Sequence, residues 1–264
     1  MRLIMESWRR FVTEATAVPD EQKAGFKQAI TASNFWTQPH TEDEVDVASD
    51  GEMSTPAIEV LMDALNAKAE ELNTDLYFLL TVTDDEQYTL GPDDTTGGYP
   101  NNWMMRGQYR GPDKGKHVVW LEFRPISDDF NMEEFNSDEL VKKISLTLNH
   151  ELVHYYQLKK QSASKGISDE DAWEELLDDP KQIDKSGTRG GYLSRHIEVD
   201  AFAHEAAEEL LDKYSPEEAL DLIRNRDREA EGVVADYINT LSDQPKELQK
   251  FWKKLYTQIK DQSR

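Results

Sequence analysis

Apolar residues recur at helical spacing near the start of the chain and again from residue 56 onward. A short amphipathic helix is predicted over residues 3–16, where apolar side chains share one face. The stretch 17–54 is polar, acidic and weakly periodic, which is typical of a solvated linker. Pro56 suits the first turn of a helix that runs to about residue 72, since the N–H that proline lacks has no partner there. We therefore predict an N-terminal helix and acidic linker over 1–53, ahead of one ordered domain over 54–264.

Three later segments have the composition of β-strands. They lie at 76–82, 102–110 and 117–123, with the glycine- and proline-containing segment 111–115 between the last two. The segment 117–123 is predicted to be a sheet edge that could pair with an extended peptide.

The pattern becomes helical after Pro125. Asn136 is a predicted helix cap, with Glu139 as its capping-box partner. A polar insertion is predicted over 160–190, with one short helix inside it. That short helix is predicted near 169–178, and further helices are predicted near 193–213, from Ser215, and near 229–241 and 245–260. Together these elements predict an α+β fold, with a small antiparallel or mixed sheet and a long helix over 54–158 and a helical part over 159–264.

Composition narrows the classes of partner. The chain has 53 acidic against 30 basic residues and a net charge of −23, so a nucleic-acid partner is not expected. It has no cysteine, and any metal would be held by His, Asp or Glu. The first residues lack the apolar core of a signal peptide, and no stretch reaches the length of a membrane span. We expect a cytoplasmic protein with no membrane partner; its oligomeric state is left open.

The segment from His150 to His154 carries the clearest chemical signal. Two histidines four apart on a helix lie one turn apart on the same face, so both imidazoles can reach one metal ion. Glu151 stands beside the first histidine, where it could take a proton from a metal-activated water. The flanking residues are uncharged, which keeps the imidazoles unprotonated as metal binding requires. The alternative is a pair of ordinary histidines on a packed helix.

The extended segment 147–156, Thr-Leu-Asn-His-Glu-Leu-Val-His-Tyr-Tyr, resembles the signature of zincin metallopeptidases. In that family the two histidines bind zinc and the glutamate is the general base. The metzincin branch is excluded, because its third histidine does not follow His154. Residues 192–203 are similar to the third-ligand segment of small gluzincin-type peptidases, including phage-encoded and ImmA/IrrE-like ones. That resemblance implies a zincin-like fold.

By the same resemblance, His150, His154 and Glu198 hold Zn²⁺. Asp200 is the main rival for the third ligand, and His196 and His204 are weaker rivals. The electrophile that steadies the oxyanion is predicted to be Tyr192. Arg195, His196 and Tyr156 are the other candidates for that role.

The sequence thus predicts a zinc-dependent metallopeptidase that acts on a peptide or protein substrate. Its opening residues, Met5 to Phe11, also resemble those of marine tailed-phage proteins, which implies a viral protein in a bacterial host cell or virion. One alternative is a non-catalytic phage structural or interaction protein that keeps the fold and a zinc site. Another is a regulatory protease that cuts one repressor-like partner.

Overall fold

The computed structural model of the chain describes residues 18–37, 46–47, 53–54, 56–82, 103–125, 137–178, 195–225, 232–242 and 244–262. These residues form an α+β fold that divides into two compact units, and the division falls after Tyr155. Val18–Tyr155 forms one unit, and the described residues from Tyr156 onward belong to the other. The helix predicted over 3–16 lies outside the described residues. None of the described helices is long and apolar enough to cross a membrane.

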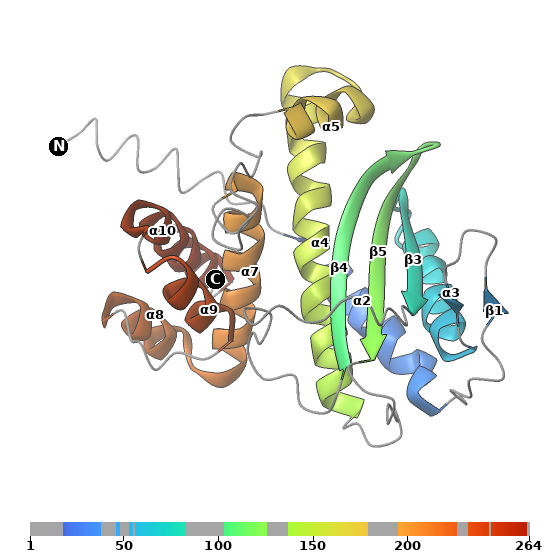
Figure 1. The fold of residues 1–264 in the computed structure, drawn as a ribbon, viewed down its shortest axis with the longest axis horizontal. Helices are drawn as coiled ribbons and strands as arrows, with labels where there is room; N and C mark the ends of the chain where they lie inside the picture. The colour runs from blue at the N-terminus through green and yellow to red at the C-terminus, as the bar shows by residue number, and fades with distance from the viewer. Residues whose placement is uncertain are drawn as a thin grey trace. The chain divides into compact units, whose positions relative to one another are not determined.

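The unit formed by Val18–Tyr155 contains a mixed β-sheet (Figure 1). Its strands are β1 (Asp46–Val47), β2 (Met53–Ser54), β3 (Leu76–Val82), β4 (Trp103–Asp113) and β5 (Lys116–Pro125), in the order β1-β2-β3-β5-β4. The strands β3 and β5 are parallel, whereas every other pair is antiparallel. The strand β5 lies between two partners, so the prediction that 117–123 forms a sheet edge is wrong. Within the described part of the chain, β4 is the edge strand on that side.

The hairpin between β4 and β5 is tighter than the sequence indicated. The segment 111–115 was predicted to separate the two strands, but β4 continues to Asp113 and only Lys114 and Gly115 form the turn. Both turn residues have positive φ, 50° and 78°, as the tight two-residue turns of hairpins require. A β-bulge at Arg110 lets the strand run on through Pro112, which an edge strand tolerates.

Two helices, α2 (Asp20–Ser33) and α3 (Pro56–Glu71), pack beside the sheet. The ring of Phe26 on α2 meets that of Phe78 on β3 edge to face, with centroids 5.1 Å apart. Asn66 on α3 accepts from the backbone N–H of Phe78 at 2.8 Å and donates to its carbonyl at 3.0 Å. The helix α2 lies inside the predicted acidic linker and was missed. Its buried Phe26, Ala29 and Ile30 form a short apolar face in an otherwise polar segment.

The long helix α4 (Ser137–Lys165) begins next to the predicted cap and runs through the division between the units. Its apolar stripe is buried as predicted, at Leu140, Val141, Ile144, Leu148, Leu152 and Tyr155. The helix extends more than one and a half turns into the predicted insertion, as far as Lys165, and the short helix α5 (Asp169–Asp178) lies where the sequence placed it.

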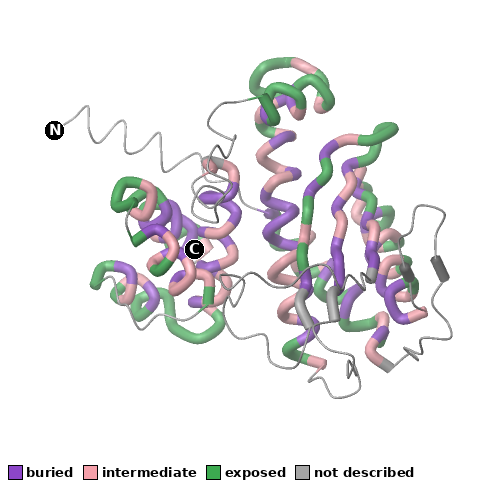
Figure 2. Tube along the Cα trace, in the orientation of Figure 1, coloured by how far each residue is buried: buried purple, intermediate pink, exposed green. Residues whose placement is uncertain are grey.

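The second unit is helical. After α5 it contains α7 (His196–Lys213), α8 (Pro216–Asn225), α9 (Gly232–Thr240) and α10 (Pro245–Gln262). Alanines at 203, 206 and 207 give α7 a small-residue face, and the rings of Tyr237 and Phe251 stack 3.9 Å apart in the same core. Figure 2 shows that buried residues gather along α7, as they do along β5 in the first unit. The predicted helix start at Ser215 is confirmed: its backbone N–H donates to Glu218 at 2.9 Å.

Candidate metal centre

The two motif histidines lie on one face of α4. Their ring centroids are 5.1 Å apart, and the planes are inclined at 75°. His150 is buried, and between the histidines Leu152 and Val153 are fully buried in apolar packing. The i, i+4 spacing on a continuous helix thus directs two imidazoles to the same side, as the sequence predicted.

Glu151 is held by the edge strand of the sheet. Its side chain is buried, and its Oε2 accepts a hydrogen bond from the backbone N–H of Tyr109 at 2.6 Å. Strand β4 and helix α4 therefore meet at the glutamate that the sequence singled out as a general base. A backbone amide is a neutral donor, so this bond orients the carboxylate without cancelling its charge.

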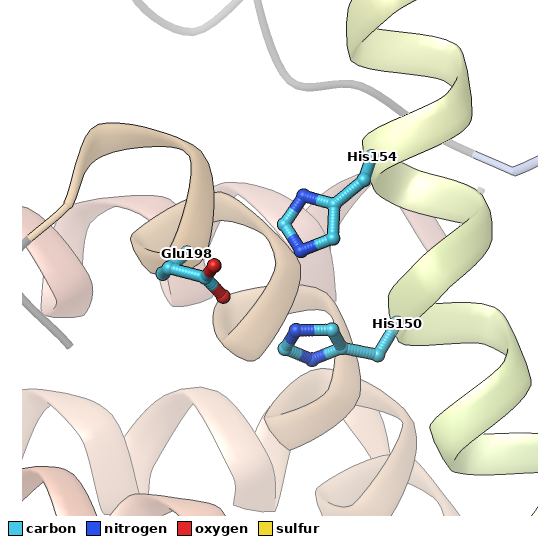
Figure 3. Close-up of side chains that lie close together, drawn as sticks. All are labelled: His150, His154 and Glu198. Atoms are coloured by element: carbon cyan, nitrogen blue, oxygen red, sulfur yellow. The ribbon is translucent and has the colours of Figure 1, made fainter. Parts of the chain in front are cut away.

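Glu198 supplies a third atom of ligand type. One ligand atom from each of His150, His154 and Glu198 lies within 4.8 Å of the other two. Figure 3 shows the two imidazoles and the carboxylate turned toward one another. A hydrogen bond at the residue before Glu198 also connects α4 to the start of α7. Gln157, three residues after His154 on α4, donates to the carbonyl of Ile197 at 3.1 Å.

Asp200, the main rival ligand, has a different partner. Residues two apart on a helix point about 200° apart around its axis, so Asp200 and Glu198 cannot share a direction. The Oδ1 of Asp200 lies 3.1 Å from Nζ of Lys254 on α10, and both side chains are buried. The carboxylate therefore forms an ion pair between two helices of the second unit.

The remaining candidates are the weaker rival ligands and the residues predicted to stabilise the oxyanion, and the structure describes some of them only in part. His204 is buried on α7 with Nδ1 3.8 Å from Glu208, and it is not among the three grouped residues. Arg195 precedes the first residue of α7, and Tyr156 is half-buried on α4. Tyr192 and the side chain of His196 lie outside the described residues. The assignment of the oxyanion-stabilising group therefore stays a prediction.

A second polar cluster in the first unit was missed by the sequence. His117 Nδ1 meets the hydroxyl of Tyr109 at 2.5 Å, and its Nε2 lies 3.6 Å from Asp75. Tyr155 also donates to Asp75, at 2.6 Å. Asp169, whose oxygen is grouped with these ligand atoms, is paired with Lys159 at 2.7 Å. Because both side-chain polar atoms of Asp75 and of His117 already have protein partners, this cluster is better explained as internal packing than as a metal site.

The contact between Tyr109 and Glu151 was also missed, because the two residues are 42 positions apart and no local pattern connects them.

Comparison with protein-family models, with curated proteins and with solved structures finds no match. The functional conclusion therefore rests on the residues of this chain alone.

Proposed function

We propose that this protein is a zinc-dependent metallopeptidase of the gluzincin type, with a zincin-like fold. His150, His154 and Glu198 would hold the metal, and Glu151 would act as general base. The observation that supports this most directly is the grouping of two imidazoles and one carboxylate within 4.8 Å. Two neutral nitrogens and one anionic oxygen suit Zn²⁺ and leave a position open for water or substrate.

The donor set fits the metal, and the neighbouring residues fit the reaction. When bound, zinc would supply Lewis-acid activation of water and of the scissile carbonyl. Glu151 would accept the proton of the attacking water and return it to the leaving amine. The amide of Tyr109 holds one oxygen of Glu151, which restricts the carboxylate to a narrow range of orientations.

The edge strand favours an extended peptide as substrate. Strand β4 pairs with β5 on one side only, within the residues that the structure describes. Its backbone reaches Glu151 at Tyr109, so a peptide that added to this edge would run close to the proposed general base.

The first experiment tests the role of Glu151. We expect Glu151→Gln to reduce hydrolysis of a peptide library about 10³-fold, since general-base catalysis contributes roughly 10²–10⁴-fold. Zinc content should stay at that of the unmodified protein, because Glu151 is not a ligand. Glu139→Gln, on an exposed position of the same helix, is the matched control. An unmodified protein that binds zinc but cleaves nothing in a broad library would instead favour the non-catalytic phage protein.

The second experiment tests the third ligand. Zinc analysis of Glu198→Ala should show weaker binding by at least tenfold, whereas Asp200→Asn should retain zinc as long as it remains folded. Circular dichroism would report folding in each variant. Loss of zinc in the Asp200 variant alone would overturn the assignment of Glu198.

A further inference from the structure

Strand β4 approaches helix α4 closely at Gly107. A Cβ atom added to Gly107 would lie 2.6 Å from Oε1 and 2.8 Å from Cγ of Glu151. It would also lie 2.8 Å from Cγ2 of Thr147, one turn earlier on the helix. All three distances are below 3.0 Å, which real Cβ atoms essentially never show, so the backbone and side chains as they stand leave room only for glycine.

The same stretch of strand provides the hydrogen bond to Glu151. Gly107 and Tyr109 are two residues apart, so they present their side-chain positions to the same face of the sheet. Their partners on β5, Leu121 and Val119, are both fully buried. The carboxylate of Glu151 thus lies across both residues, with Oε2 at the amide of Tyr109 and Oε1 over the bare Cα of Gly107.

We propose that Gly107 is a positioning residue for Glu151: its missing side chain lets the helix approach close enough for the Tyr109 amide to hold the carboxylate. The catalytic consequence of this inference rests on the proposed function, whereas the geometric part does not. A glutamate side chain has three rotatable bonds, and one fixed oxygen removes most of that freedom. A displacement of about 1 Å at a reacting group can reduce turnover about 10²-fold.

The geometric part is tested without zinc or substrate. In the unmodified protein the Tyr109 amide should resonate at low field and exchange slowly, because its acceptor is a charged carboxylate at short distance. In Gly107→Ala, NMR should show the resonance moved upfield and the exchange protection reduced about tenfold or more. Gly25→Ala is the matched control, since a Cβ there meets only flexible side chains, the nearest atom being Leu72 Cδ1 at 3.2 Å. An unchanged Tyr109 amide in Gly107→Ala would overturn the inference.

A double-mutant cycle separates positioning from general misfolding. Truncation of Glu151 to Ala removes the two nearest atoms that the new Cβ would meet. Gly107→Ala should therefore lower the urea midpoint clearly less in the Glu151→Ala background than in the unmodified one. Equal shifts in the two backgrounds would show that Gly107 acts independently of Glu151 and would overturn the proposal.

The catalytic part is tested by steady-state kinetics. Gly107→Ala should lower kcat about 10²-fold, while KM and zinc content change by less than about threefold. Normal kcat in that variant, beside an active parent, would overturn the inference and leave the proposed function intact. An inactive parent would overturn the proposed function and the catalytic part together, and the Tyr109 amide would still decide the geometric part.

Discussion

Two buried carboxylates, Glu151 and Asp200, are held in different ways in the two units of the molecule. Glu151 on α4 accepts from the backbone amide of Tyr109 at 2.6 Å. Asp200 on α7 lies 3.1 Å from the ammonium group of Lys254 on α10. Both side chains are at least nine-tenths buried, so burial alone does not separate their roles.

The two carboxylates differ in the group that holds them, a backbone amide for Glu151 and an ammonium group for Asp200. An amide orients a carboxylate and leaves its negative charge in place, whereas an ammonium group neutralises that charge. A general base must accept a proton, and a carboxylate paired with an ammonium group accepts one less readily. This difference supports a chemical role for Glu151, the predicted general base, and a structural role for Asp200, the predicted rival for the third ligand. The ion pair with Lys254 also gives Asp200 a partner other than a metal, which is consistent with the proposal of Glu198 as the third ligand.

The largest expected effect comes from removing the cation of the structural pair. Lys254→Met leaves the buried carboxylate of Asp200 without its counter-charge, and we expect the free energy of unfolding to fall by about 3–5 kcal/mol. Urea denaturation followed by circular dichroism measures it. The double variant Lys254→Met/Asp200→Asn should recover a large part of the loss. A loss below 1 kcal/mol would mean that the ion pair is not structural.

An intermediate loss of stability is expected where an uncharged side chain, that of Asn66, holds the backbone. Asn66 makes two hydrogen bonds to the backbone of Phe78, and Asn66→Ala leaves both backbone groups without them. We expect a loss of roughly 2 kcal/mol in unfolding free energy, at about 1 kcal/mol for each bond. Asn66→Asp keeps the acceptor and loses the donor, so its loss should be intermediate at high salt. A larger loss for Asp than for Ala would indicate that charge, not bonding, governs this position.

The smallest effect comes from an exposed carboxylate. Hydrogen bonds from the side chain and backbone of Ser215 hold the pKa of Glu218 below its ordinary value. A carboxyl with a lowered folded pKa adds stability that is complete above its unfolded pKa and is lost as pH falls through the folded one. Glu218→Gln should therefore destabilise the protein slightly at neutral pH and not at strongly acidic pH. Thermal melts at the two pH values, with exposed Glu217→Gln as the control, check the difference.

Local patterns predicted much of the fold. The strand 76–82 and the helices that begin at Pro56 and near Asn136 follow from periodicity and capping within a few residues. The helix α2 was missed because its apolar face is only three residues wide in a polar segment. The position of β5 inside the sheet could not be deduced, because strand order depends on contacts between segments distant in the sequence.

The candidate site divides in the same way. His150, Glu151 and His154 lie within one and a half turns of helix, so their spacing carries the signal. The amide of Tyr109 and the space at Gly107 are provided by a strand more than 40 residues earlier. A backbone N–H donor is present in almost every residue, and single glycines occur in many strands. Neither therefore forms a sequence motif that could have been recognised. A resemblance to gluzincin-type peptidases pointed to Glu198, and one of its carboxylate oxygens lies within 4.8 Å of a ligand atom of each histidine.

The turn at Lys114 and Gly115 has a consequence far from its own position. The turn fixes the register between β4 and β5. A shift of the register by one residue would exchange the two faces of a strand. If one amino acid inserted into this exposed turn shifted the register by one residue, the long side chain of Gln108 would stand where Gly107 now stands. The length of a surface loop would then decide whether the proposed base has room. Loop length, rather than any change at the motif, would then determine whether Glu151 keeps its position against the strand.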